Sequence, residues 1–255
     1  MGKTSLMMSM AKKITERSDH AVGFISLETS VDHLMERIIS SVAKIPMPAI
    51  KKARLVDKEW NRIEDALAKV KDDLLYIVEN PNNNIEGISE TIESLVENHK
   101  VKIVMLDYLQ LVEGIRGKRN REQEISSVIR ELKKLTRTLK IVIISASQLN
   151  RSVELRGGAK RPVLADLRDS GAIEEDTDKV IFIHRPELYD IYEDELGNSL
   201  EGIAELIVAK NRTGPMGSVL LRFDSEFGRF YEINTDPAAF GDISPDDLPD
   251  YESPF

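Results

Sequence analysis

The first residues of the chain have types and an order that suit phosphate binding. They match the second half of the loop G-x-x-x-x-G-K-[S/T], and they are Gly2, Lys3, Thr4 and Ser5. In such a loop, backbone N–H groups and the start of the following helix hold phosphates, the lysine neutralises their charge, and the hydroxyl binds Mg²⁺. Only Met1 precedes this match, so we expect the leading glycine and the strand that feeds the loop to lie upstream. The tetrapeptide also occurs by chance, and the prediction of nucleotide hydrolysis therefore needs support from the rest of the sequence.

Four apolar runs end in polar side chains that could act on a bound nucleotide. In open α/β sheets, ligands lie beyond the carboxyl ends of the strands, which is where such residues project. We therefore expect them to share one edge of a sheet with the start of the helix that carries Lys3. They are Glu28 after residues 25–27, Asp107 after 103–106, Gln148 after 143–147, and Lys210 and Arg212 after 207–209.

Each of these residues has a catalytic and an ordinary interpretation. Asp107 follows four apolar residues. A carboxylate in this position can order the water shell of Mg²⁺ beside Thr4, but an aspartate can also serve as a cap at the end of a strand. Glu28 could accept a proton from an attacking water, or it could interact with a helix dipole. Gln148 could orient that water or sense a γ-phosphate, or it could bond within a loop. Lys210 and Arg212 could stabilise transition-state charge, or they could be solvated residues of a hairpin.

The elements that must position these residues are predicted from hydrophobic periodicity and turn signals. Helices are expected over residues 3–17, 31–43, 58–71, 85–100 and 122–139, and strands over 22–27, 74–78, 101–106, 141–144 and 179–183. Residues 204–209, 218–223 and 229–233 are expected to add antiparallel strands, with a turn at 214–217. Alternation of apolar strands with helices predicts an α/β fold in which a mostly parallel, twisted sheet is flanked by helices and carries antiparallel strands at its C-terminal edge.

Composition and charge narrow the classes of function. The chain has 255 residues and no cysteine, which excludes disulfides and cysteine-based zinc sites, and no apolar run predicts a membrane span or a signal peptide. The net charge is −9, but residues 235–255 carry six acids and no base, whereas residues 151–168 carry a net +3. That locally basic segment can contact phosphates, although a solvated loop is the alternative. We expect residues 235–255 to be an acidic, disordered tail.

Several strings together resemble the C-terminal RecA-like motor domain of DnaB-family replicative DNA helicases. They occur in the family's order at residues 1–4, 26–28, 107–111, 147–151, 160–162, 166–171 and 210–214. The Asp-Tyr-Leu-Gln-Leu string at 107–111 and the Ser-Gln-Leu-Asn-Arg string at 147–151 separate this family from recombinases of the same fold. The resemblance implies a RecA-like P-loop NTPase domain over residues 1–234. It also implies an ATP-driven hexameric ring that moves along single-stranded DNA and separates the duplex at a replication fork.

The resemblance also implies roles for individual residues. Gly2, Lys3, Thr4 and Ser5 would bind ATP, and Thr4 would hold Mg²⁺ together with Asp107, which acts through water. Glu28 would be the catalytic carboxylate, and Gln148 would couple the γ-phosphate to the DNA-binding loops. Lys210 and Arg212 would reach ATP bound by the neighbouring subunit. The residues expected to contact DNA are Arg151, Lys160, Arg161, Arg168, Asp169 and Gly171.

The implied partners and location also follow the family. A replicative helicase of this type acts in the cytoplasm of a bacterium or in phage replication, with a primase and a helicase loader as partners and no membrane. The acidic end, residues 246–255, weakly resembles the tips of bacterial single-strand-binding proteins that dock on replisome proteins. A solubilising, disordered end is the alternative for this segment.

Some features depart from the family and leave alternatives open. Thr29 stands where methionine is usual, and Asp169, Glu175 and Thr177 replace the commoner Glu, Gln and Ala. The N-terminal helicase domain, the linker helix and the front of the phosphate loop are not in the sequence, so we expect the chain to bind ATP weakly by itself. One alternative is a non-catalytic remnant that only assembles with intact subunits. Another is a RecA-like recombinase or clock-type ATPase.

Overall fold

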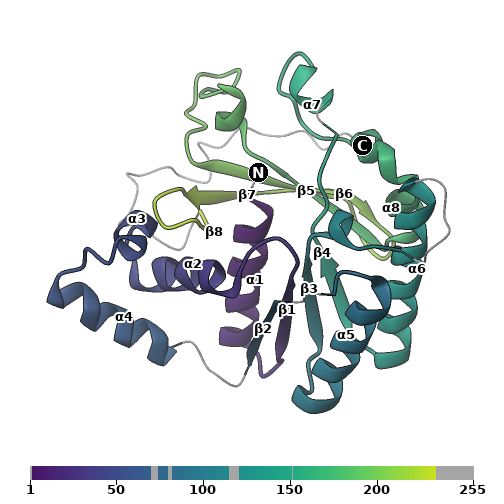
Figure 1. Ribbon diagram of the computed structural model, residues 1–255. Helices are drawn as coiled ribbons and strands as arrows, with labels where there is room; N and C mark the ends of the chain where they lie inside the picture. The colour runs from purple at the N-terminus through teal and green to yellow at the C-terminus, as the bar shows by residue number, and fades with distance from the viewer. Residues whose placement is uncertain (1, 70–73, 80–81, 115–120, 151, 234–255) are drawn as a thin grey trace.

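The computed structural model describes residues 2–69, 74–79, 82–114, 121–150 and 152–233. Figure 1 shows two sheets with helices packed around and between them. A central parallel sheet has the strand order β2-β1-β3-β4, and an antiparallel sheet from the C-terminal part has the order β5-β6-β7-β8. The predicted α/β class is therefore confirmed, although the antiparallel strands form a sheet of their own rather than an edge of the parallel one.

The parallel sheet is built from four short, largely apolar strands. They are β1 (Val22–Ser26), β2 (Leu75–Glu79), β3 (Ile103–Asp107) and β4 (Val142–Ser145). All three pairings are parallel, and Ser26 lies opposite Asp107 at the end of the β1–β3 register. Every residue of β1 is buried, as expected for a strand that is covered on both faces. Because the strands run in one direction, their carboxyl ends meet at one edge.

In the part of the chain that the structure describes, six helices precede or cover strands of this sheet. They are α1 (Lys3–Arg17), α2 (Val31–Ala43), α3 (Met47–Lys51), α4 (Asp57–Lys69), α5 (Ile85–His99) and α6 (Arg121–Leu139). Two of them begin where the sequence supplies a cap, because the side chains of Ser30 and Asn84 accept hydrogen bonds from the amides of His33 and Gly87.

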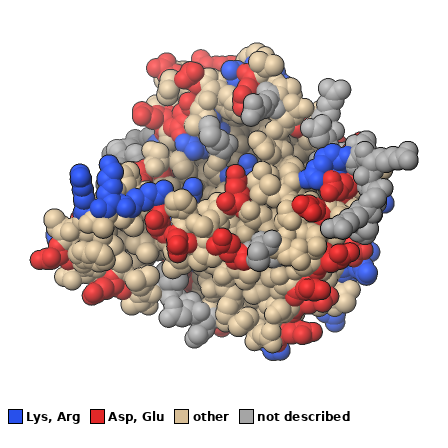
Figure 2. All heavy atoms as spheres, in the orientation of Figure 1, with Lys and Arg blue, Asp and Glu red and all other residues tan. Residues whose placement is uncertain are grey.

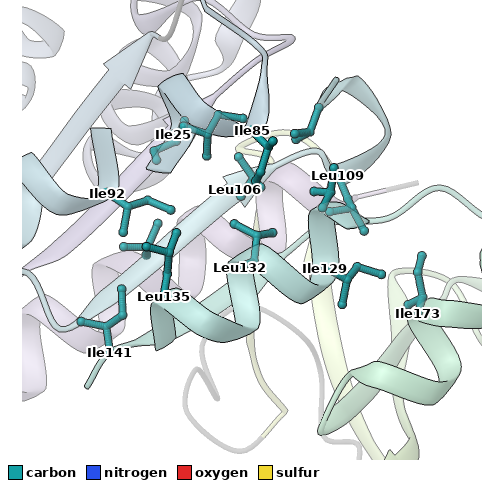
Figure 3. Close-up of a cluster of buried hydrophobic side chains, with 14 of the residues drawn as sticks. Ile25, Ile85, Ile92, Leu106, Leu109, Ile129, Leu132, Leu135, Ile141 and Ile173 are labelled. Carbon is teal, nitrogen blue, oxygen red and sulfur yellow. The ribbon is translucent and has the colours of Figure 1, made fainter. Parts of the chain in front are cut away.

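The core lies in two layers, one on each face of the parallel sheet. Met7 and Met8 of α1 and Leu34 of α2 pack with Phe24 on one face. On the other face, α5 and α6 bury a stripe of isoleucine and leucine against β1 and β3, as Figure 3 shows. The labelled residues there include Ile25, Ile92, Leu106, Leu132 and Leu135. This sandwich fixes the strand ends that carry the candidate catalytic residues.

Short helical segments connect several of the larger elements, and the C-terminal part ends in the antiparallel sheet. The short segments are η1 (Leu109–Leu111), α7 (Ser152–Leu155), η2 (Leu164–Ser170), α8 (Gly171–Asp176) and η3 (Pro186–Tyr189). The strands are β5 (Lys179–His184), β6 (Ile203–Asn211), β7 (Gly217–Asp224) and β8 (Arg229–Glu232). Val180 and Phe182 of β5 share the core of α5 and α6, which joins the two sheets.

Two of the predictions concern membrane spans and the acidic segment at the C-terminal end of the sequence. Among the described residues, no helix has the length and apolar character needed to cross a bilayer. The acidic segment 235–255 lies outside the described residues. Figure 2 shows acidic and basic side chains on the same face, with a row of Lys and Arg over the α3 region at its left edge. Charge is thus unevenly distributed, and the net value of −9 is a poor guide to any local contact.

Candidate nucleotide-binding site

Thr4 and Asp107, 103 positions apart in the sequence, meet at the carboxyl edge of the parallel sheet. Thr4 lies in the first turn of α1, and its Oγ1 donates a hydrogen bond of 2.6 Å to Oδ2 of Asp107. Asp107 ends β3 and is fully buried, with 0% of its surface exposed. Its second carboxylate oxygen, Oδ1, is buried without a hydrogen-bond partner among the described residues. A hydroxyl beside a buried carboxylate oxygen that is free to accept is a donor set that suits the water shell of Mg²⁺.

Glu28 is held at the same edge by the end of β1. The amide of Leu27 donates to the carbonyl of Asp107 at 2.8 Å, which continues the β1–β3 register by one bond. The hydroxyl of Ser26 then donates to the carbonyl of Thr29 and accepts from its amide, so residues 26–29 form a closed bend. Glu28 sits on this bend with its side chain exposed. The structure therefore places Glu28 at the edge where Thr4 and Asp107 meet.

Gln148 follows β4 and is positioned by a residue that the sequence analysis did not single out. The side chain of Gln110 donates from Nε2 to the hydroxyl of Ser147 at 2.7 Å, and its Oε1 accepts from the amide of Gln148 at 3.2 Å. The amide of Leu109 also donates to the carbonyl of Ala146, at 2.9 Å. These bonds fix the segment after β4 to the segment after β3. The signal for Gln110 was its place inside the string 107–111.

Arg37 is a second residue that the sequence analysis missed. It lies in the middle of α2, where a helical pattern gives no hint of a ligand. Its Nη1 donates to the hydroxyl of Ser5 at 3.3 Å, and its Nε is buried without a partner among the described residues. The guanidinium thus stands beside the first turn of α1. It adds positive charge at the helix end where backbone N–H groups favour an anion.

Gly2 has a backbone that suits glycine alone. Its φ is 101°, in the left-handed region, and a side chain added there would meet Cζ of Phe230 at 3.1 Å. The amide of Phe230 donates to the hydroxyl of Ser9 at 3.1 Å, so β8 lies along α1. The phosphate-loop residues are therefore backed by the last strand of the antiparallel sheet.

Lys210 and Arg212 contact a different part of the molecule. Lys210 donates from Nζ to the carbonyls of Glu174 and Glu175, the latter at 3.3 Å. Arg212 donates to the carbonyl of Glu175, and its Nη1 lies 3.4 Å from Oδ1 of Asp178. Both cations thus lie at the C-terminal end of α8. The structure does not bring them to the cluster of Thr4, Glu28 and Asp107.

The residues expected to contact DNA have several environments. Arg161 donates from Nε to Glu205 at 3.0 Å and again from Nη2, and Glu205 is only 3% exposed. Nζ of Lys160 lies 5.6 Å from the ring centre of Tyr189. Arg151 lies outside the described residues. So do the side chains of Arg168 and Asp169, whose backbone belongs to η2; Gly171 begins α8.

A buried histidine lies beside the Arg161–Glu205 pair. His184 is 3% exposed, and burial lowers the pKa of its imidazole, although the nearby Glu205 carboxylate opposes that shift. Its Nδ1 has no hydrogen-bond partner among the described residues, and its ring stacks on Tyr189 with the centroids 5.8 Å apart. Burial also raises the pKa of the Tyr189 phenol. This polar cluster supports the segment that leads to η2.

Comparison with known proteins identifies the family of this fold and site. The profile of the DnaB-like helicase C-terminal domain matches residues 1–232. The chain is 38% identical over 230 residues to a probable plasmid replicative DNA helicase of Chlamydia psittaci, covering 90% of this chain and 49% of that protein. It is 34% identical over 234 residues to the replicative DNA helicase DnaC of Bacillus subtilis, covering 91% and 50%. The chain therefore spans about half the length of these relatives.

Two solved structures match over nearly the whole chain. One is a DnaB-like replicative helicase studied with its interactions with primase, and the other is an ATPase domain. Each superposes with a TM-score of 0.82 at 35% identity and covers 91% of this chain. The match covers 55% of the first structure's chain and 81% of the second. The matched profile is that of helicases, which disfavours the recombinase alternative.

Proposed function

The chain belongs to the DnaB-like helicase C-terminal domain family, and from this premise we propose that it is the ATP-hydrolysing motor of a replicative DNA helicase. The observation that carries the proposal is the meeting of Thr4 with a fully buried Asp107, one of whose carboxylate oxygens has no partner among the described residues. A buried carboxylate oxygen of this kind is costly, and it is retained where a cation is to be held. Glu28 and Gln148 follow the neighbouring strands at the same edge.

The residues of the cluster divide the work of phosphoryl transfer. Backbone amides at Gly2 and in the first turn of α1 hold the β- and γ-phosphates, and Lys3 neutralises their charge. Thr4 and Asp107 would hold Mg²⁺, Asp107 through water, and the ion would supply neutralisation of the phosphate charge. Glu28 accepts the proton of the attacking water, and Gln148 orients that water and relays the state of the γ-phosphate. Arg37 adds positive charge beside Ser5.

The remaining parts of the proposal concern DNA and assembly. The segment from Lys160 to Gly171 contacts the phosphate backbone of single-stranded DNA in the centre of a homohexameric ring. Such contacts read no sequence and weaken with salt. In the assembled ring, Lys210 and Arg212 act on ATP bound by the neighbouring subunit. A primase and a helicase loader are the expected protein partners, and interactions with primase are described for one solved relative.

The test measures ATP hydrolysis by the purified protein with and without oligo(dT), alongside Lys3→Ala and Glu28→Gln. We expect turnover that DNA stimulates, loss of nucleotide binding in Lys3→Ala, and loss of turnover with retained binding in Glu28→Gln. Unwinding of a forked duplex then separates a helicase from a DNA-dependent ATPase. A protein that assembles with intact helicase subunits but hydrolyses nothing contradicts the motor and favours the non-catalytic remnant.

A further inference from the structure

Three cations converge on the C-terminal end of α8. Lys210 donates to the carbonyls of Glu174 and Glu175, and Arg212 donates to the carbonyl of Glu175. Lys133 of α6 donates from Nζ to the carbonyl of Asp176 at 2.6 Å. The last carbonyls of a helix have no partner within the helix and carry partial negative charge. These three side chains therefore stabilise the end of a helix that has only six residues.

Asp178 orients two of these cations. Its Oδ1 lies 3.1 Å from Nζ of Lys133 and 3.4 Å from Nη1 of Arg212. Its carbonyl also accepts a hydrogen bond of 3.0 Å from the amide of Arg212. Beside this group lies a hollow of about 650 Å³, bordered by Arg212 and by basic residues of α6 that include Arg130, Lys133, Lys134 and Arg137. Asp176, which pairs with Arg130, also borders this hollow, where basic side chains outnumber acidic ones.

Helix α8 continues directly from the segment expected to contact DNA. η2 ends at Ser170 and α8 begins at Gly171. The start of this segment is fixed, because Asp166 is 3% exposed, forms an ion pair with Arg156 and accepts a bond of 2.7 Å from the amide of Val163. Its carbonyl also accepts from the amide of Asn150 at 3.0 Å. The end of α8 is instead held by side chains that are partly exposed, and Arg212 is 46% exposed.

We propose that Lys210 and Arg212 exchange the carbonyls of α8 for the phosphates of the neighbouring subunit's nucleotide, and that Lys133 and Asp178 are positioning residues for this exchange. The inference rests on the proposed function, in which these two cations reach the neighbour's ATP. A triphosphate is a stronger acceptor than a neutral carbonyl, because hydrogen bonds between charged groups are shorter and stronger. When Lys210 and Arg212 leave, Lys133 alone still caps the C-terminal end of α8. The adjoining DNA-binding segment is then released at its α8 end, while its start at Asp166 stays fixed.

Hydrogen exchange of the amides in residues 171–178 tests the exchange of partners without any need for turnover. The variants are Lys210→Ala and Arg212→Ala, and the matched control is Lys134→Ala, because Lys134 borders the same hollow but pairs with Glu131 of its own helix at 3.6 Å. Both variants are expected to exchange several-fold faster over this segment. The control is expected to match the wild type. Equal exchange in all four proteins, or equal acceleration in the control, overturns the proposal.

A second arm uses the unaltered cations and a chemical probe. Sodium tripolyphosphate is added to Lys3→Ala protein, in which the phosphate loop is disabled. We expect the probe to accelerate exchange of residues 171–178, and to have no effect on this segment once Arg212→Ala and Lys210→Ala are also introduced. A probe that leaves the segment unchanged overturns the proposal, even if a variant in the first arm fails to fold.

A third measurement addresses Lys133 as a positioning residue. In Lys133→Met, the difference in oligo(dT) affinity between the ATPγS-bound and ADP-bound protein should shrink by about 2- to 30-fold, as for residues that carry coupling between sites. Lys134→Met should preserve the difference. A merely structural role of Lys133 would lower thermal stability and leave the difference intact. Failure here with normal DNA-stimulated hydrolysis refutes the inference alone, whereas absent hydrolysis refutes the proposed function.

Discussion

At the scale of single residues, the site combines groups whose places are fixed by very different means. Asp107 owes its position to the register of β3 with β1, and no described residue donates to its buried Oδ1, which leaves that oxygen for a ligand. Gly2 owes its importance to its backbone, because φ is 101° and the ring of Phe230 lies against it. Asp107 thus offers an oxygen that can accept from a ligand, and Gly2 allows the backbone to pass close to Phe230.

Gly2→Ala should impair nucleotide binding and stability together. A left-handed φ costs a residue with a side chain about 1–2 kcal/mol, and the new methyl group would press on Phe230. Urea denaturation should therefore give a free energy of unfolding lower by about 1–2 kcal/mol. Gly157→Ala is the control, because nothing lies within 4 Å of a side chain added there. Equal stability of Gly2→Ala and wild type would show that this backbone conformation is not retained in solution.

Arg161 could either contact DNA or stabilise the fold, and a measurement of the free energy of unfolding distinguishes these two roles. It was expected to contact DNA, yet it pairs twice with Glu205, which is buried. Arg161→Ala would leave that carboxylate buried without its partner, and we expect a loss of about 2–4 kcal/mol in the free energy of unfolding. Lys160→Gln is the neighbouring control, and it should weaken oligo(dT) binding without a comparable loss. If Arg161→Ala weakens DNA binding but unfolds like wild type, Arg161 belongs to the DNA surface instead.

At the scale of elements, much of the arrangement could be predicted and the pairings between distant elements could not. Apolar runs and caps such as Ser30 and Asn84 are local signals, so the strands of the parallel sheet and the longer helices are predicted close to their bounds, whereas the short α3 is not predicted. The convergence of residues after each strand followed from parallel pairing alone. The contact of Lys210 with α8, and that of Gly2 with β8, depend on how separate elements pack, and no local pattern encodes them.

The same limit explains Arg37 and Arg161. Arg37 faces Ser5 from the middle of α2, where only its helical phase relative to α1 decides what it meets. Arg161 looked like one of several basic residues in a loop until β6 supplied Glu205, 44 positions later. The sequence shows that Arg161 is a basic residue in a basic loop. Only the fold shows that its side chain pairs with a carboxylate of the same chain.

The antiparallel sheet should carry a pH dependence of stability through His184 on β5. Burial lowers the pKa of His184 below its ordinary value of about 6.5, so the unfolded chain binds a proton at a pH where the folded chain does not. The contribution is therefore fully present above pH 6.5 or so, and it is lost as the pH falls from there through the lowered folded-state value. His184→Gln should flatten the stability curve below about pH 6.5.

Chemical denaturation at a series of pH values measures this slope. His20→Gln is the control, because His20 is an exposed histidine. Glu205, Arg161 and Tyr189 surround His184. A slope that survives in His184→Gln would assign the dependence to other groups.

At the scale of the whole molecule, the two sets of candidate catalytic groups lie on separate regions of one chain. Lys3 and Asp107 belong to the parallel sheet and α1, whereas Lys210 and Arg212 lie against α8 and α6. In the proposed ring, one subunit's first set meets the next subunit's second set. Each active site would then need two chains.

Mixing two inactive variants tests this division. Lys3→Ala should lose nucleotide binding, and Arg212→Ala should bind nucleotide normally but turn over about 10³-fold more slowly or worse. After the two proteins are mixed and reassembled, about a quarter of the interfaces unite two intact halves, and ATP turnover should partly return. Mass spectrometry of the reassembled rings gives the ratio of the two variants in them. If rings that contain both variants hydrolyse no more ATP than either variant alone, Arg212 acts in the site of its own subunit. Loss of tight binding in Arg212→Ala would lead to the same conclusion.

The contact between Ser9 of α1 and Phe230 of β8 has a consequence for biosynthesis. These residues are 221 positions apart, so α1 lacks this neighbour until β8 has been synthesised. A nascent chain can assemble β1 to β4 earlier, but its phosphate loop remains without the backing of Phe230. If the proposed function holds, a chain that ends before β8 should fold in part and bind nucleotide more weakly, because Gly2 then lacks the support of Phe230.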